Sequence, residues 1–375
     1  MQADKVAKEY QMLEKSVREF AAKMLRPRLE ENDRYPVSDD FAKAVEKAME
    51  LEYFSVMLPE DMNGFGGKTL PLGIVLSCIS ETDAAMGAMI LTNAVAQEIM
   101  LTAGETDIVR DICGKADWSR ELLIAFPLLT DPEEDEILLS AKKEDGKYRL
   151  SGTAEYVVMG PMARRALVPA KLGNEPGYGF FLVDLDLPES SSQGAISSAG
   201  LHACPASDIK FMGAQARLMG RMEDGPRYYE QTCIKMLPAA AAVAGGLMQG
   251  SMKEALSYCK KRRQGGRRII DWSELRLILS DMLLAANTGR ILLDNAFRAV
   301  DAHSAKWAED ALTASVYVLE TACRQTSDGI QALGGYGYTK HSFQERRFRD
   351  AQHLRSIFGS AVPRRLAYAK LGLNC

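Results

Sequence analysis

The most informative run of this chain is Asp328-Gly-Ile-Gln-Ala-Leu-Gly-Gly-Tyr-Gly-Tyr338. Two shorter runs follow it, Arg346-Arg-Phe-Arg-Asp350 and Phe358-Gly-Ser360. A glycine that ends a helix would account for one or two of the glycines in the first run, but not for the whole string. Glycine carries no side chain and lets a main chain approach a bound group closely. The string is therefore more than the end of a helix requires.

The last third of the chain predicts long helices around this run. The first covers about 238–262, where Pro238 is tolerated only if it lies in the first turn. Asp271 and Glu274 resemble a capping box that opens the second helix. Two more helices are expected over about 306–332 and from about 343. The second helix has one apolar face at helical spacing, made by Leu275, Leu279, Met282, Ala286, Leu293 and Phe297. Helices with apolar stripes predict an antiparallel four-helix bundle.

The first two thirds differ from each other in pattern. Residues up to about 104 read as helical, and Ser38 and Asp39 are good N-caps for a helix through about Leu51. The middle of the chain has short β-prone runs, and Asp145-Gly146 between two of them is a strong hairpin signal. The predicted fold class is α+β, with three domains: an all-α domain over 1–120, an antiparallel β domain over 121–228 and the helical bundle over 229–375.

Composition excludes several classes of protein. The 375 residues are 47% hydrophobic and 26% charged, which is ordinary for a soluble globular protein. A net charge of -4, from 46 basic and 50 acidic residues, gives no reason to expect nucleic acid or a membrane surface as a partner. The seven cysteines include no CxxC pair, which favours reduced thiols in a cytoplasmic protein. The four histidines show no metal-ligand spacing, so no metal site is expected.

The order of domains and the glycine string resemble the acyl-CoA dehydrogenase family over nearly the whole chain. The resemblance implies FAD as cofactor, an acyl-CoA substrate and an electron-transferring flavoprotein as electron acceptor. In that family the glycine-rich segment lies at a subunit contact and holds FAD, here through Gln331, Gly334 and Gly335. The segment Tyr258 to Gly266 resembles the one that meets the FAD pyrophosphate of a neighbouring subunit, and it retains Arg262. A homo- or hetero-oligomer, either a dimer or a tetramer, is therefore expected.

Other FAD contacts are expected from the β domain and the C-terminal run. Thr130 resembles a threonine that hydrogen-bonds the flavin ring, and Tyr156 takes the place of an aromatic residue that stacks on it. Val158 sits where a hydroxyl usually contacts the flavin, and Ser360 closes the Gly-Ser pair of the last run. One departure is marked: Glu133–Glu136 replaces a small turn that normally approaches FAD phosphate and the CoA chain. Four acidic groups there predict either a displaced loop or weaker phosphate binding.

The second departure concerns the catalytic base. In most of the family the residue at position 358 is the glutamate that takes a proton from the substrate, but here it is Phe358. Some members carry that glutamate on the first bundle helix, at the position of Met236, followed by an arginine where this chain has Leu237. A phenylalanine cannot act as a general base. These residues, together with Thr92, predict an apolar substrate pocket in a divergent family member that lacks the usual base.

Three hypotheses follow for function. The first is a dehydrogenase that oxidises the α,β bond of a CoA thioester, suited to a bulky cyclic or aromatic acyl group, with Asp83 or Glu98 as weak candidates for the base. The second is a base-less subunit that completes the FAD site of a catalytic sister chain through Arg262 and Gln331. The third is other flavin chemistry, either a monooxygenase or an acyl-CoA enzyme without net redox change. The intact Gln331–Gly335 segment argues mildly against the third.

Overall fold

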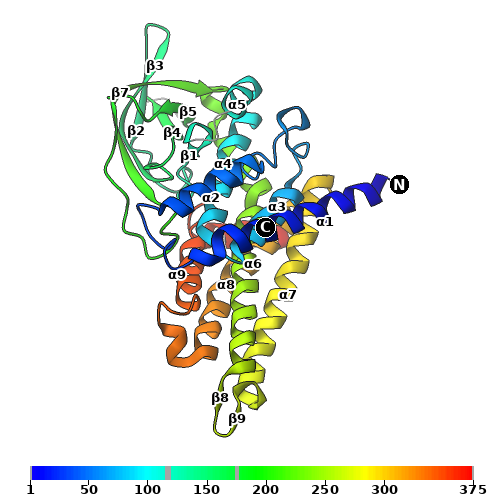
Figure 1. The fold of residues 1–375 in the computed structure, drawn as a ribbon. Coiled ribbons are helices and arrows are strands. Elements are labelled where there is room, and N and C mark those ends of the chain that lie inside the picture. Colours follow the sequence, from blue (N-terminus) through cyan, green and yellow to red (C-terminus); the bar gives the residue numbers. More distant parts are fainter. Residues whose placement is uncertain (1, 115–119, 174–176, 374–375) are drawn as a thin grey trace.

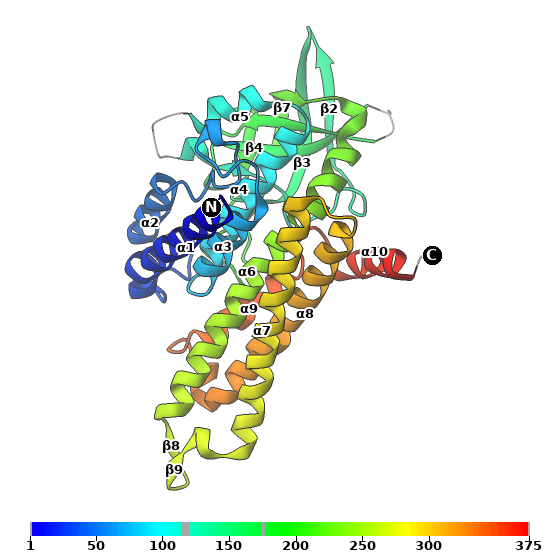
Figure 2. The ribbon, with the colours of Figure 1, turned by 90° about the vertical axis from the view of Figure 1, so that its right-hand side faces the viewer.

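The computed structural model describes residues 2–114, 120–173 and 177–373 and has three parts in chain order (Figure 1). A helical N-terminal part is followed by a β-sheet and then by a long helical bundle. This order confirms the predicted α+β fold class. The β-sheet lies at one end of the molecule, and the far tip of the bundle lies at the other (Figures 1 and 2).

The N-terminal part is built of five α-helices among the described residues. Ser38 caps the second of them by accepting a hydrogen bond from the Phe41 N–H, as the sequence predicts. The fourth is long and apolar enough to cross a membrane, but 94% of it is buried inside the protein, so it is a core helix here. The helices are α1 Gln2–Phe20, α2 Asp39–Glu50, α3 Thr69–Ser80, α4 Ala84–Thr102 and α5 Thr106–Cys113.

One sheet of seven strands forms the middle part within residues 120–173 and 177–219, in the order β1-β4-β2-β3-β7-β5, with β6 beside β7. Most neighbours are antiparallel, as predicted, but β4 runs parallel to β1 and to β2. The strand Lys147–Val158 is continuous, because it pairs with β7 on both sides of a register shift between Ala154 and Val157. The strands are β1 Ile124–Ala125, β2 Leu139–Glu144, β3 Lys147–Val158, β4 Arg165–Leu172, β5 Gly179–Asp184, β6 Ser190–Ser192 and β7 Ala206–Met219.

The bundle begins earlier than its sequence predicts. Helix α6 spans Gly225–Lys261, so Pro238 lies well inside it, and the expectation of a first-turn proline is wrong. Proline removes one helical hydrogen bond, but residues 236–244 are all buried, and this packing holds the helix together. The capping box is also wrong: Trp272 is the N-cap of the next helix, and Asp271 instead pairs with Arg268 at 3.3 Å.

The remaining elements complete the bundle and its tip. Two short strands, β8 Arg263–Gln264 and β9 Arg267–Arg268, make a hairpin between α6 and α7. Leu279, Met282, Ala286, Leu293 and Phe297 on α7 are buried, which confirms most of the predicted apolar face, whereas Leu275 is only partly buried. The later helices are α7 Ser273–Ala302, α8 Trp307–Leu333, α9 Gln344–Leu354 and α10 Ala361–Leu373.

Candidate functional site

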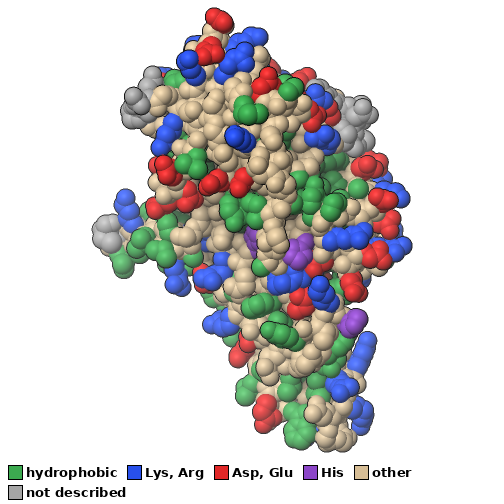
Figure 3. Space-filling model, turned by 90° about the vertical axis from the view of Figure 1, so that its left-hand side faces the viewer, with side chains coloured by type: hydrophobic (Ala, Val, Ile, Leu, Met, Phe, Trp, Pro, Cys, Tyr) green, Lys and Arg blue, Asp and Glu red, His purple; other side chains and the backbone are tan. Residues whose placement is uncertain are grey.

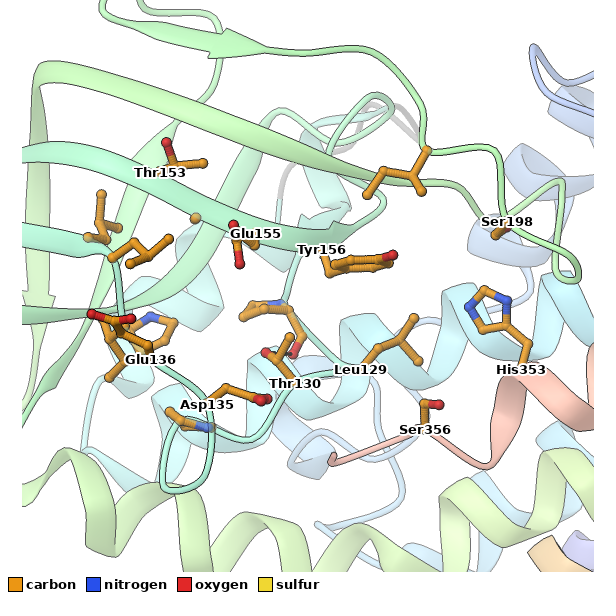
Figure 4. Close-up of a pocket in the computed structure, with 18 of the residues that line it drawn as sticks. Leu129, Thr130, Asp135, Glu136, Thr153, Glu155, Tyr156, Ser198, His353 and Ser356 are labelled. Carbon is orange, nitrogen blue, oxygen red and sulfur yellow. Dashed lines mark hydrogen bonds between the residues drawn. The ribbon is translucent and has the colours of Figure 1, made fainter. Parts of the chain in front are cut away.

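A cavity of about 780 Å³ lies between the β-sheet and the carboxyl end of α9 (Figure 4). We call it the sheet cavity. Its floor and walls come from the segment after β1, from β3 and from the loop after β6, so three distant parts of the chain meet there. Its lining residues include Leu129, Thr130, Asp135, Glu136, Thr153, Glu155, Tyr156, Ser198, His353 and Ser356.

Thr130 and Tyr156, two of the predicted flavin contacts, both line the sheet cavity. The register of β3 against β7 shifts between Ala154 and Val157, which places an extra residue in β3. Such a bulge re-aims side chains, and here the Tyr156 ring, 45% exposed, projects into the cavity near Thr130 (Figure 4). The bulge is held by Asp208, whose carboxylate accepts the Tyr156 N–H at 3.0 Å.

Val158 and Ser360 are not among the residues that line this cavity. Val158 is 4% exposed, and its N–H and C=O pair with the main chain of Phe126 at 2.9 and 3.1 Å. Ser360 is exposed to solvent after the last turn of the Phe358 segment. Their flavin contacts stay predictions.

Several cavity residues were not singled out from the sequence, among them His353 and Ser356, at and just beyond the end of α9. Burial lowers the pKa of the His353 imidazole below its ordinary value, and the neighbouring His202 lowers it further. A neutral imidazole therefore faces the cavity near neutral pH and offers one donor and one acceptor. Both residues lie in the sequence between the Arg346–Asp350 and Phe358–Ser360 runs. This position was the only feature of the sequence that could have marked them as cavity residues.

A second cavity, of about 1000 Å³, lies at the far tip of the bundle, and we call it the tip cavity. It brings together four of the residues predicted to contact FAD: Arg262, Gln331, Gly334 and Gly335. The tip and the sheet lie at opposite ends of the molecule (Figures 1 and 2). One chain therefore does not bring both groups of residues to a single ligand.

The tip cavity fits a dinucleotide phosphate. Gly334 has φ 62° and ψ −144°, a conformation that is essentially restricted to glycine. A Cβ placed on Gly334 or Gly335 would meet no atom within 4 Å, so the exposed main chain borders open space that a ligand can enter. Arg262 is exposed beside it, and a guanidinium matches phosphate in charge and geometry.

The rim of the sheet cavity does not fit a phosphate. Asp135 accepts the Asp131 N–H at 2.8 Å, and Asp131 accepts the Glu133 N–H at 3.0 Å, so carboxylates occupy backbone donors that an anion would use. Burial and the surrounding acidic groups raise the pKa of Asp131. Asp135 and Glu136 line the cavity itself. The cavity thus suits an uncharged ring beside Tyr156 better than a phosphate at this turn.

Comparison with known proteins identifies the family of this chain. The family model "Acyl-CoA dehydrogenase, N-terminal domain" matches residues 7–112, and "Acyl-CoA dehydrogenase, C-terminal domain" matches residues 229–370. The chain belongs to the acyl-CoA dehydrogenase family. FAD is the cofactor typical of this family.

Relatives match almost end to end. Benzylmalonyl-CoA dehydrogenase from Aromatoleum aromaticum is 26% identical over 88% of this chain and 91% of its own length. A subunit of the caffeyl-CoA reductase–Etf complex of Acetobacterium woodii is 24% identical over 91% of this chain and 92% of its own. The solved structure of butyryl-CoA dehydrogenase from Megasphaera elsdenii, 21% identical, superposes with a TM-score of 0.87 over 97% of this chain and 98% of that one. The structural likeness shows the acyl-CoA dehydrogenase fold.

The two positions where the resemblance predicts a base, Phe358 and Met236, are buried in this chain. Phe358 is 7% exposed, Leu237 5%, and Met236 is fully buried, and all three belong to one hydrophobic core. Thr92 is also fully buried, and its hydroxyl donates to the Ala88 carbonyl at 2.7 Å. None of these four residues lines either of the two cavities.

The loop around Phe358 is locked onto the β domain. The Phe358 N–H donates to the Leu128 carbonyl at 2.8 Å, and Phe358 has φ +56°. The next residue, Gly359, has φ +83°, and a Cβ there would lie 2.8 Å from the Asp131 Cβ. A left-handed phenylalanine costs roughly 1–2 kcal/mol, so packing and the hydrogen bond must hold it in place.

The two carboxylates considered as substitute bases already have partners. Asp83 is the N-cap of α4, where it accepts the Ala85 and Met86 N–H groups, and it pairs with Arg346 at 2.9 Å. Glu98 pairs with Lys235 at 2.7 Å. Both side chains therefore have structural roles in this conformation, and neither lines the sheet cavity.

Proposed function

We propose that this protein is a subunit of an FAD-dependent acyl-CoA dehydrogenase-type oxidoreductase that acts on a CoA thioester with a bulky aromatic or cyclic acyl group. The observation that carries the proposal is the sheet cavity, where a bulge presents Tyr156 opposite Thr130. Tyr156 would stack on the flavin ring, and Thr130 would orient it through a hydrogen bond. FAD, when bound, supplies the hydride acceptor of the reaction. The role of the protein is to hold that ring and to shield it from water.

The acyl group and the electron acceptor are proposed from the relatives. Benzylmalonyl-CoA dehydrogenase and the caffeyl-CoA reductase–Etf complex are both named for acyl-CoA compounds that carry an aromatic ring. The second name also includes an electron-transferring flavoprotein, which we propose as the electron acceptor here. Apolar side chains that line the sheet cavity, among them Leu129, Ile137 and Ile196, suit such a ring, because burial of aromatic surface is strongly favourable.

A second candidate is a base-less subunit that completes the FAD site of a catalytic sister chain. It is favoured by one specific observation: Phe358 and Met236 are apolar and buried, while Asp83 and Glu98 are held in ion pairs. In that arrangement Arg262 and Gln331 of this chain would serve the partner's flavin, and proton removal would occur in the partner. The two candidates share the family and the cofactor and differ only in where the base lies.

Flavin binding is the first test. The full chain is expressed alone, and bound FAD is quantified by absorbance after gel filtration. We expect Tyr156→Ala to lower FAD retention at least tenfold. Tyr368→Ala is the matched control, since Tyr368 is 37% exposed and lines neither cavity, and it should retain FAD. Equal retention by Tyr156→Ala and by the control would contradict the proposed flavin position.

Anaerobic reduction separates the two candidates. Aromatic and straight-chain acyl-CoA thioesters are added without oxygen, and flavin bleaching is followed at its visible maximum. Bleaching of the protein alone by an aromatic acyl-CoA supports the dehydrogenase and removes the base-less subunit. Bleaching only after a related sister chain is added supports the second candidate. No bleaching in either case would refute both.

A further inference from the structure

One edge of the sheet cavity is polar without being acidic. It is formed by His353 and Ser356, at and just beyond the end of α9, and by Ser198 in the loop after β6. Figure 4 shows these three side chains on the opposite side of the cavity from Glu136, with the Tyr156 hydroxyl pointing toward them. A planar ring stacked on Tyr156 would therefore extend toward them. We call these three residues the polar edge.

The two ring nitrogens of His353 have different surroundings. Burial lowers the pKa of the imidazole most, the neighbouring His202 lowers it further, and a hydrogen bond to the Gly200 main chain raises it. A hydrogen bond that favours the charged form is one in which the ring N–H donates, so Gly200 supplies the accepting carbonyl. Figure 4 shows one ring nitrogen of His353 on the side of Ser198 and the other toward Tyr156. Because the neutral ring carries a single N–H, the nitrogen that faces the cavity is an acceptor.

The carboxylates around the polar edge already have partners. Asp33 pairs with His202 at 3.0 Å and with Arg349 at 2.6 Å. Asp350 accepts a main-chain N–H of the loop after β6 at 2.7 Å. Within residues 2–114, 120–173 and 177–373, no carboxylate forms an ion pair with His353. The cavity-facing nitrogen of His353 is therefore left for a ligand.

The loop that faces His353 is fixed against α9. Arg349 donates to the Ala199 carbonyl at 3.0 Å. A Cβ placed on Gly200 would lie 2.6 Å from the Arg349 carbonyl oxygen, so the two backbones pack directly on each other. Packing thus sets the position of Gly200, and with it the tautomer of His353, before any ligand enters. An acceptor that is oriented in advance loses little entropy on binding.

We propose that His353 is the specificity-determining hydrogen-bond acceptor of the sheet cavity and selects a planar heteroaromatic ring whose edge carries an N–H. This role rests on the proposed function, since the ring meant is that of a flavin. Oxidised flavin carries a ring N–H between two carbonyl groups, which matches one acceptor beside hydroxyl groups. A purely hydrocarbon ring would leave the half-buried nitrogen without a donor, which is unfavourable.

The acceptor exists only while the imidazole is neutral. Protonation turns the cavity-facing nitrogen into a second donor, so binding of the ring should weaken on acidification. Figure 3 shows histidine side chains at the surface between the β-sheet end and the tip of the bundle, where protons from solvent reach them. Burial raises the pKa of the Asp350 carboxyl to about 6, so this group titrates in the same range and must be separated from His353. The charged and titratable groups on the elements packed around His353 are Asp33, His202, Glu345, Arg346, Arg349, Asp350, Asp131, Asp135, Glu136 and Glu155.

Riboflavin binding tests the role of His353 on the full chain after removal of bound FAD. Riboflavin has the ring but no phosphate, so the tip cavity plays no part. Its dissociation constant is measured by fluorescence quenching between pH 8 and pH 5.5 for the wild type, His353→Gln and His353→Leu. His341→Gln is the matched control, since His341 is exposed and lines neither cavity. Circular dichroism at each pH checks that every variant is folded.

We expect wild-type binding to weaken about tenfold from pH 8 to pH 5.5, the size expected when a donor loses its acceptor. The amide of His353→Gln keeps an acceptor at every pH, so this variant should bind like the wild type at pH 8 and show no such dependence. His353→Leu should bind about tenfold more weakly at pH 8 and be equally independent of pH. His341→Gln should reproduce the wild-type profile. A structural role of His353 alone would not move this profile.

A second measurement needs no variant. 3-Methylriboflavin carries a methyl group in place of the ring N–H, and its binding to the wild type should be weaker at pH 8 and independent of pH. An unchanged pH dependence in His353→Gln, or with 3-methylriboflavin, would overturn the role of His353 while leaving the proposed function intact. Failure of the wild type to bind riboflavin and FAD at any pH would overturn both.

Discussion

Phe358→Glu introduces the residue type that the family resemblance predicts at this position, and the structure predicts that the change is destabilising. Phe358 is 7% exposed and belongs to the main hydrophobic core. Replacing its ring by the two methylenes of glutamate forfeits about 2 kcal/mol of apolar burial. A buried carboxyl must also stay neutral, which costs about 1.4 kcal/mol for each pH unit above its ordinary pKa near 4.3.

The lost apolar burial and the cost of keeping the carboxyl neutral together predict a loss of stability that depends on pH. At pH 7 the neutralisation adds roughly 3–4 kcal/mol, so the unfolding free energy should fall by about 5–6 kcal/mol in total. At pH 5.5 the same term is only about 1.7 kcal/mol, and the total loss should be near 4 kcal/mol. The loss grows with pH because burial raises the pKa of the introduced carboxyl. The folded state then keeps a proton that the unfolded state releases, so folding becomes less favourable as pH rises. Phe358→Gln is the matched control, since it has the same shape and no titration.

Urea unfolding at both pH values measures this difference. We expect the gap between the glutamate and glutamine variants to be larger at pH 7 than at pH 5.5 by about 2 kcal/mol. We also expect no turnover of straight-chain acyl-CoA by Phe358→Glu, because Val158 still stands where the resemblance predicts a hydroxyl that contacts the flavin. A glutamate variant as stable as the glutamine variant at pH 7, or one with robust turnover, would show that the site is open and hydrated, and the reasoning would fail.

Three further predictions concern the surrounding structure. Arg346→Met should destabilise the protein by about 3–5 kcal/mol in urea unfolding, because it strands the buried carboxylates of Asp83 and Asp350; a loss below 1 kcal/mol would contradict that role. Burial lowers the pKa of His353 in the folded state, so below the ordinary pKa of 6.5 the unfolded state binds more protons than the folded state. The wild type should therefore lose up to about 1.4 kcal/mol of stability for each pH unit of acidification below 6.5. His353→Gln should remove this loss, which urea unfolding of both proteins over this pH range measures. Gly334→Ala should cost about 1–3 kcal/mol through its backbone conformation and also lower FAD retention, whereas Gly372→Ala, on an exposed helix, should do neither; equal melting temperatures of the two variants would refute the strain.

Local patterns were read correctly where the residues that make an element are neighbours in sequence. The Ser38 N-cap, the buried face of α7 and the long helix over Trp307–Leu333 are examples. Helical and strand periodicities express contacts within a few residues, so they survive in the sequence. The errors at Pro238 and at Asp271 occurred where packing or an ion pair overrode a local preference. Burial around α6 outweighs one lost hydrogen bond, and no local signal records that burial.

The sequence by itself determined the family, the three-part order of the chain and the absence of a carboxylate at Phe358 and Met236, because each of these is written in residue types and short spacings. Only the tertiary structure decided that both positions are sealed, that Asp83 and Glu98 are held in ion pairs, and that His353 faces the sheet cavity. It also separated Tyr156 from Arg262 by the length of the bundle. These facts depend on contacts between residues that are far apart in the chain. The folding of the chain, and not the local propensity of any segment, sets how close such residues lie, how deeply they are buried and which charges they meet.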